Sequence, residues 1–125
     1  MIREALTSAE LAPPIGPFSQ AVRAGGFIFL SGQVAQAPTT GKLIAGDVTA
    51  QTEQIFKNLH AVLRAAGKSF ADVVRVGVFL SDMKDFSQMN AVYERQFEAP
   101  YPARTTIAIS ALPLGAAVEI ELVAQ

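Results

Sequence analysis

The chain has 125 residues and a mass of 13.3 kDa, and its ten basic and eleven acidic side chains leave a formal net charge of −1. This length predicts a single domain over residues 1–125, and the half-apolar composition excludes a disordered chain. With no cysteine and one histidine, His60, disulfides and thiol chemistry are excluded and a metal site is not expected. The lack of basic excess, of a signal-peptide pattern and of a spanning apolar run predicts a cytoplasmic protein without nucleic-acid or membrane partners.

The first half of the chain predicts one strand and one long helix. Residues 27–31 are aromatic and β-branched and follow the Gly25-Gly26 turn, which is typical of a strand. Apolar residues at helical spacing from Asp47 to Ala66 predict an amphipathic helix. Asp47 is suited to cap its first turn, and Gly67 to adopt the left-handed conformation after its last turn.

The next two elements are a second strand and a second helix. Residues 73–80 alternate so that Val74, Val76, Val78 and Leu80 share one face. In the helix that follows, Asp85 and Gln88 have the spacing of a capping box. Its apolar stripe consists of Phe86, Met89, Tyr93 and Phe97.

Two further strands, residues 104–110 and 117–124, complete the predicted fold. Ile107 and Ile109 share one face of the first, and Val118, Ile120, Leu122 and Ala124 share one face of the second. We expect these faces to lie beneath the helices. The element order predicts an α+β domain in which both helices cover one face of a mixed sheet.

Two helices leave the other face of such a sheet uncovered. We expect this face to carry Arg104, Thr106, Glu119, Arg75, Val73 and Phe79, and a mixed face on so apolar a chain predicts a homo-oligomer. The same alternation predicts that Arg104 and Glu119 lie on one side of the sheet. An arginine and a glutamate together are either an anion-binding and proton-transfer pair or an ordinary ion pair, and the spacing leaves both open.

Short motifs spread over nearly the whole chain resemble one known family. They are Ile15-Gly16-Pro17-Phe18-Ser19-Gln20, Ser31-Gly32-Gln33, Gln54 with Asn58, Ala65-Ala66-Gly67, Asp82-Met83 with Asp85-Phe86, Asn90, Tyr93, Phe97, Pro102-Ala103-Arg104, Leu112-Pro113 and Val118-Glu119-Ile120-Glu121. By this ordered set the chain resembles the Rid (YjgF-like) family of reactive-intermediate, or enamine/imine, deaminases. The resemblance implies a chorismate-mutase-like subunit in a homotrimer with clefts between subunits. It also implies hydrolysis of 2-imino acids to 2-oxo acids and ammonia, downstream of pyridoxal-phosphate-dependent dehydratases and without cofactor or metal.

The resemblance also implies roles for seven residues. Arg104 matches the arginine that binds the substrate carboxylate, and a guanidinium offers the two parallel donors which that group requires. Glu119 matches the acid that positions or activates water. The expected cleft lining consists of Phe18, Ser31, Gly32, Asn90 and Thr106. Phe18 departs from the tyrosine of many relatives, so any role of a phenol hydroxyl there is lost.

Other functions and residues remain open from the sequence. The alternatives are a non-catalytic carboxylate-binding trimer, a deaminase dedicated to one pathway, and RNA cleavage, against which the near-neutral charge argues. We interpret His60, Tyr93 and Phe97 as packing residues and Asp82 and Asp85 as helix-entry residues. A Ser31 nucleophile is not expected without a histidine partner.

Overall fold

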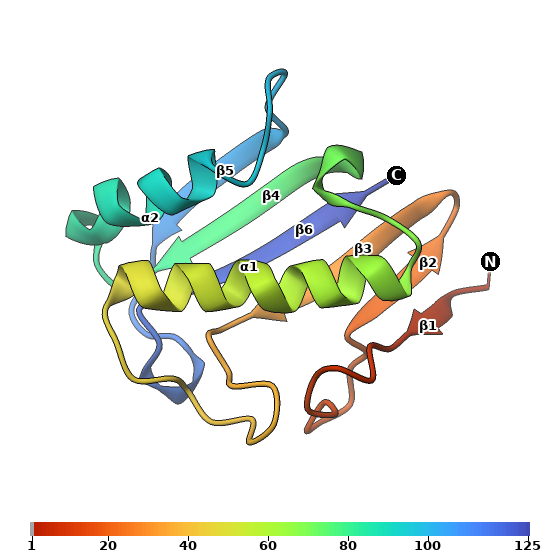
Figure 1. Ribbon diagram of the computed structural model, residues 1–125, viewed down its shortest axis with the longest axis horizontal. Coiled ribbons are helices and arrows are strands. Elements are labelled where there is room, and N and C mark those ends of the chain that lie inside the picture. Colours follow the sequence, from red (N-terminus) through yellow and green to blue (C-terminus); the bar gives the residue numbers. More distant parts are fainter. Residues whose placement is uncertain (1) are drawn as a thin grey trace.

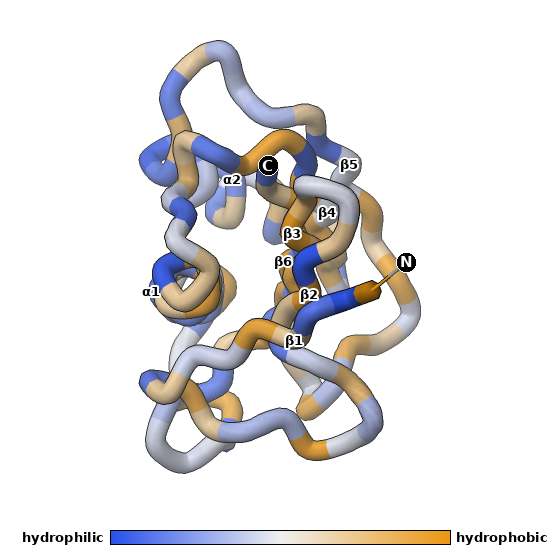
Figure 2. Tube along the Cα trace, turned by 90° about the vertical axis from the view of Figure 1, so that its right-hand side faces the viewer, coloured by the Kyte–Doolittle hydropathy of each residue, from blue (hydrophilic) through white to orange (hydrophobic). Residues whose placement is uncertain are grey.

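The computed structural model, which describes residues 2–125, is a six-stranded sheet covered on one face by two helices (Figure 1). Seen from the side, α1 and α2 lie on the same side of the sheet (Figure 2). The predicted α+β class is confirmed. The elements are β1 (Glu4–Leu6), β2 (Ala21–Ala24), β3 (Phe27–Gln33), α1 (Val48–Ala65), β4 (Val73–Leu80), α2 (Phe86–Glu94), β5 (Ala103–Ala108) and β6 (Val118–Ala124).

The strands are arranged in the order β1-β2-β3-β6-β4-β5. All neighbours are antiparallel except β4 and β5, which are parallel. The hairpin between β2 and β3 turns at Gly25 and Gly26, whose φ angles of 58° and 81° are those a tight primed turn requires. As a result β6, the last strand in the chain, lies in the middle of the sheet, and β5 forms one edge.

Helix α1 begins and ends as its sequence predicts. The Asp47 carboxylate accepts a 3.0 Å hydrogen bond from the Ala50 backbone N–H. At the other end, Gly67 has a φ of 73°, and the N–H of Lys68 donates to the Leu63 carbonyl at 2.8 Å, which closes a Schellman motif. The buried face of α1 packs on β3 and β6, with Ile55, Leu59, Val62 and Leu63 fully buried.

Helix α2 differs from its prediction at the first turn. Asp85 makes no side-chain hydrogen bond to the helix within residues 2–125, so the predicted capping box with Gln88 is wrong. Instead a 3₁₀ turn over Met83–Asp85 precedes α2, and the Asp82 carboxylate accepts from the N–H of Lys84 at 3.0 Å. The cap therefore lies one turn earlier, and Asp82 has the helix-entry role that we expected.

The buried faces of β4 and β5 also differ from prediction. A bulge between Val73 and Arg75 reverses the alternation at the start of β4, so that Val73 is buried and Val74 is 41% exposed. On β5, Ile107 pairs with Phe79 on the open face and is 43% exposed. Ile109, beyond the end of β5, is 36% exposed. The prediction that these two isoleucines lie beneath the helices is wrong, because alternation within a strand does not determine which face turns inward at a sheet edge.

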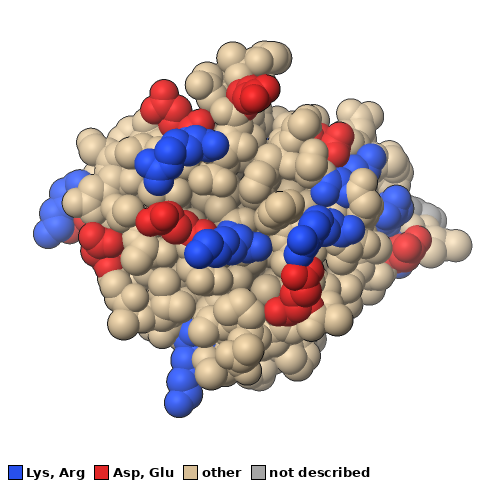
Figure 3. Space-filling model, viewed as in Figure 1, with Lys and Arg blue, Asp and Glu red and all other residues tan. Residues whose placement is uncertain are grey.

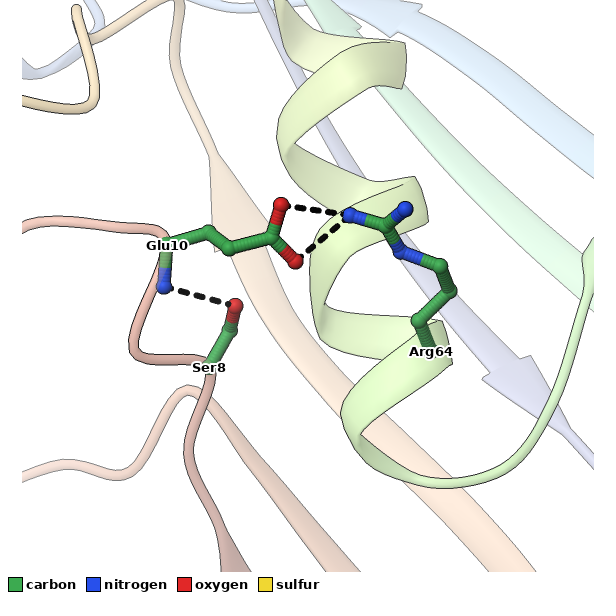
Figure 4. A network of polar contacts seen from close by, with 3 residues as sticks. All are labelled: Ser8, Glu10 and Arg64. Atoms are coloured by element: carbon green, nitrogen blue, oxygen red, sulfur yellow. Dashed lines mark hydrogen bonds and ion pairs between the residues drawn. The ribbon is translucent and has the colours of Figure 1, made fainter.

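The segment between β1 and β2 is held to the outside of α1 (Figure 4). The Arg64 guanidinium donates to both Glu10 carboxylate oxygens at 2.5 Å, and the Glu10 N–H donates to Ser8 Oγ at 3.2 Å. The pair is more than half exposed, so it contributes at most about 1 kcal/mol. It anchors the loop that leads into the Phe18 segment.

Candidate active site

Arg104 lies on the edge strand β5, with its side chain beneath α2. It pairs with Val76, whose side chain is in the core, so both point to the helix side of the sheet. Arg104 Nη1 donates to Asn90 Oδ1 at 2.7 Å. The guanidinium carbon lies 4.5 Å from the centre of the Tyr93 ring and 5.6 Å from that of Phe86. Three α2 side chains therefore hold one cation, through a hydrogen bond and two aromatic contacts.

This arrangement leaves hydrogen-bonding capacity on the arginine. A guanidinium carries five N–H donors in a planar fork. Within residues 2–125, the Asn90 amide oxygen is the one acceptor that Arg104 contacts. Because the aromatic rings fix the plane without using donors, the remaining N–H groups suit a carboxylate, which takes two of them in parallel.

Glu119 lies on the opposite face of the sheet. It occupies β6, pairs with Phe79 and follows Val118, whose side chain is in the core. The carboxyl group is half-buried against β3 at Gly32. Burial raises the pKa of Glu119 above its ordinary value, and the negative charge of Glu121 raises it further. A carboxyl group with a raised pKa binds its proton more tightly than an exposed glutamate does, which is a property that acid–base catalysis can use.

The prediction that Arg104 and Glu119 lie on one side of the sheet is wrong. Arg104 shares its face with Val76 and Leu122, whereas Glu119 shares the other face with Phe79. The two strands are separated by β4, which adds about 10 Å of strand spacing. The error has the same origin as the misplaced isoleucines: at this edge Arg104, not Ile107, turns inward, because α2 offers it an amide and two rings.

The five expected lining residues occupy both sides of the sheet. Asn90 contacts Arg104 directly, and Thr106 lies two residues further along the same face of β5. The buried Thr106 hydroxyl has no hydrogen-bond partner among residues 2–125. Gly32 borders Glu119. Asn90 and Thr106 therefore group with the arginine, and Gly32 groups with the glutamate.

Ser31 lies within β3, and Phe18 lies in the segment that leads into β2. The Ser31 hydroxyl donates to the Ser19 carbonyl at 2.7 Å, and the Ser31 N–H donates to the Gln20 carbonyl at 3.0 Å. These bonds fix residues 19–20 against β3 next to Gly32. Phe18 is 55% exposed, which leaves its ring free to line a surface cleft.

Tyr93 is the residue whose role the sequence interpretation missed. It is buried, as a packing residue should be, but the face of its ring also carries the Arg104 guanidinium. The available signal was its spacing of three residues from Asn90, which places both on one face of α2. His60 is exposed, and its ring lies 5.6 Å from the Phe70 ring, centre to centre.

Among residues 2–125, no helix has the length and apolar character needed to cross a membrane. In the same range, no group of three or more histidine, cysteine, aspartate or glutamate side chains is placed to hold a metal ion.

The chain is a two-layer α+β domain that presents a guanidinium held by α2 on one face of its sheet and a half-buried carboxyl group on the other. Comparison with known proteins agrees with this class. The family model described as Endoribonuclease L-PSP matches residues 9–125, and the chain belongs to this family, the Rid or YjgF-like proteins. The resemblance seen in its motifs is thereby confirmed.

Individual relatives match over almost the whole chain. A RutC family protein from Pyrococcus horikoshii is 43% identical over 98% of each chain. The human 2-iminobutanoate/2-iminopropanoate deaminase is 40% identical over 99% of this chain and 90% of its own. A solved structure of E. coli TdcF with bound serine superposes with a TM-score of 0.90 at 35% identity, covering 97% and 98% of the two chains. The family thus includes proteins named as deaminases of 2-imino acids.

Proposed function

We propose that this protein hydrolyses reactive 2-imino acids, formed from enamines such as 2-aminoacrylate, to 2-oxo acids and ammonia. The observation that carries the proposal is the position of the Arg104 guanidinium, which Asn90 and the Tyr93 ring hold in place. Its remaining N–H groups are available to a ligand. A 2-imino acid has its carboxylate directly beside the reacting carbon. A fork that fixes the carboxylate therefore also fixes the imine carbon.

The proposed reaction needs one carboxyl group and water. Arg104 binds the substrate carboxylate, and Glu119 accepts a proton from water as its oxygen adds to the imine carbon. The C=N bond becomes a single bond in a tetrahedral carbinolamine. Glu119 then returns the proton to nitrogen. It next takes the proton of the carbinolamine hydroxyl and passes it to the same nitrogen, so that the C=O bond forms, the C–N bond breaks, and ammonia and the 2-oxo acid leave. The raised pKa of Glu119 suits these transfers. The substrate is the product of an eliminating, pyridoxal-phosphate-dependent dehydratase.

The two groups meet only if a second copy of the chain contributes one of them. We propose a homotrimer of chorismate-mutase-like subunits in which the β5 edge of one protomer lies against the open face of the next. The apolar side chains on that face support this arrangement, since Phe27 and Phe29 on β3 are 37% and 45% exposed and Ile107 on β5 is 43% exposed. Each cleft then has Arg104, Asn90 and Thr106 on one wall and Glu119, Gly32, Ser31 and Phe18 on the other.

The decisive experiment measures ammonia release from 2-iminopropanoate generated in situ by an amino-acid oxidase. Charge-assisted hydrogen bonds contribute about 1.5–3 kcal/mol each, so Arg104→Ala should lower kcat/KM by about 10²-fold or more. Arg64→Ala removes an exposed arginine from the outside of α1 and is the matched control, with activity expected to be unchanged. An Arg104→Ala enzyme as active as the wild type would refute the assignment.

Subunit mixing tests the shared cleft. Arg104→Ala and Glu119→Gln homotrimers should each be nearly inactive. When the two variants are unfolded and refolded together, mixed trimers contain some clefts with both native groups, and activity should return. Mixtures that stay as inactive as their components would contradict a cleft between protomers.

A second candidate function is carboxylate binding without turnover. TdcF, which was solved with bound serine, favours it, because an amino acid carries the carboxylate that Arg104 is suited to hold. Calorimetry with 2-oxobutanoate and serine, alongside the imine assay, separates the two functions. Binding without faster imine loss would favour this reading. RNA cleavage, which the family description names, has less support: the net charge is −1, and both signs of charge alternate on the helix face (Figure 3).

A further inference from the structure

The Glu119 side chain lies directly over a residue that has no side chain. An ideal Cβ built on Gly32 would lie 3.2 Å from Glu119 Cγ and 3.0 Å from Cδ, with Oε2 nearer still. The last approach is closer than non-bonded atoms tolerate, so the carboxyl occupies space that any other residue at position 32 would fill. Three successive atoms of the glutamate are involved, so the side chain lies flat across β3.

The backbone does not explain the glycine. Gly32 is not among the residues of the described chain with positive φ, so its conformation is open to other amino acids. It lies in a β-bulge, because β3 advances three residues from Leu30 to Gln33 while β6 advances two, from Leu122 to Ile120. The bulge brings the Cα of Gly32 under the neighbouring glutamate. What excludes a side chain here is Glu119 itself.

We propose that Gly32 is a positioning residue for Glu119: its missing side chain lets the carboxyl lie against β3 in the orientation that proton transfer to water and substrate requires. This inference rests on the proposed function for its consequence in catalysis, but the contact is independent of it. With a methyl group at position 32, the carboxyl must rotate away from the strand into solvent.

Position and proton affinity change together in this arrangement. Packing against the strand removes water from one side of the carboxyl, and burial is the larger cause of its raised pKa. Rotation into solvent restores that water, so the pKa of Glu119 should fall toward its ordinary value. The charge that also raises the pKa of Glu119 is that of Glu121 on β6, and Arg75 on β4 pairs with Val123, four residues further along β6. Neither needs to move when Gly32 is replaced.

The chain contains a matched control. Gly77 on β4 pairs with Glu121, and a Cβ there would lie 3.1 Å from Glu121 Cγ and 3.4 Å from Oε1. Gly77→Ala therefore adds the same methyl group to the same sheet face, beside a glutamate that the proposed reaction does not use. If alanine in a strand has a general effect on activity, both Gly32→Ala and Gly77→Ala will show it. An effect that acts through Glu119 will appear only in Gly32→Ala.

A stability cycle tests the contact without any assay of activity. Gly32→Ala should lower the melting temperature. The same change in a Glu119→Ala background should not lower it, because the carboxyl group that clashes with the new methyl group is absent. Should Gly32→Ala fail to fold, recovery of folding in the double variant makes the same point. An equal fall in melting temperature in the wild-type and Glu119→Ala backgrounds would overturn the inference.

Activity and titration test the consequence. Gly32→Ala should lower kcat by about 10–100-fold with KM changed less, because Arg104 lies on the other face of the sheet. Its Glu119 side-chain ¹³C signal should titrate at lower pH than in the wild type, and Gly77→Ala should leave kcat materially unchanged. Wild-type kcat and titration in Gly32→Ala would refute the positioning role. A wild type without imine hydrolysis would refute the proposed function, while the stability cycle and the titration would still decide the contact.

Discussion

Replacing Tyr93 with phenylalanine should make the protein more stable. Tyr93 is 4% exposed, and its ring packs 4.9 Å from Phe97 and 6.0 Å from Phe56, centre to centre. Its hydroxyl oxygen is buried and has no hydrogen-bond partner among residues 2–125. Burial raises the pKa of the phenol more than the positive charge of Arg104 lowers it, which agrees with a group that has lost its water. Folding thus removes this hydroxyl from water without replacing the lost bond.

The magnitude follows from that loss. A buried polar group without a partner costs about 1–3 kcal/mol, so Tyr93→Phe should gain about 1 kcal/mol in the free energy of unfolding. For a chain of this size the melting temperature should rise by roughly 4 °C. Phenylalanine keeps the ring under Arg104, so the Kd for 2-oxobutanoate should stay within about twofold of the wild type.

Calorimetry and thermal unfolding of two variants test this reasoning. Tyr93→Leu keeps an apolar side chain but removes the ring. It should weaken 2-oxobutanoate binding by about 2–30-fold, which corresponds to a cation–π contact of about 0.5–2 kcal/mol. A Tyr93→Phe protein that is less stable, or that binds the ligand more weakly, would refute the account. The hydroxyl would then have a partner outside the chain, in the ligand or in a second protomer.

The remaining predictions concern Glu119 and the start of α1. Because the pKa of Glu119 is raised above its ordinary 4.5 and water activation needs the ionised form, kcat/KM should fall as the pH drops through the raised value. Glu119→Gln should lower the rate about 10²–10⁴-fold and abolish that pH dependence after correction for spontaneous hydrolysis. The folded state holds the Glu119 proton more tightly than the unfolded state does. The free energy of unfolding should therefore fall as the pH rises from 4.5 through the raised pKa of Glu119. Because glutamine cannot ionise, Glu119→Gln should unfold at a higher urea concentration than the wild type at neutral pH. Asp47→Ala should cost about 1 kcal/mol in urea unfolding, with loss of its bond to the Ala50 N–H, and an unchanged midpoint would contradict the capping role.

The elements predictable from sequence are those whose signals are local. Helix α1 combines a long apolar stripe with Asp47 at one end and Gly67 at the other, and both termini were predicted within a residue or two. Strand β4 matches its predicted range of residues 73–80. The short strands β1 and β2 were not predicted, because three or four residues carry too little pattern, and pairing across the sheet stabilises them instead.

The sequence was enough to predict which residues belong to the candidate site, but not how those residues are arranged in space. The motif around Arg104 and the glutamates of β6 could be read directly from the chain. The side of the sheet that each faces depends on what α2 places above β5, and Asn90 and Tyr93 acquire their roles only through that packing. The contact of Glu119 with Gly32 depends on a bulge in β3 that alternation does not encode.

The central place of β6 affects how the sheet is assembled during synthesis. β6 joins the β1-β2-β3 meander to the β4-β5 pair, yet it is the last of the six strands to leave the ribosome. Until it emerges, the nascent chain consists of two half-sheets with unpaired inner edges, which are open to pairing with other chains. A stop codon between Ala108 and Val118 would therefore divide the sheet through its middle, whereas the loss of a few residues at the β1 end would only shorten one edge of the sheet.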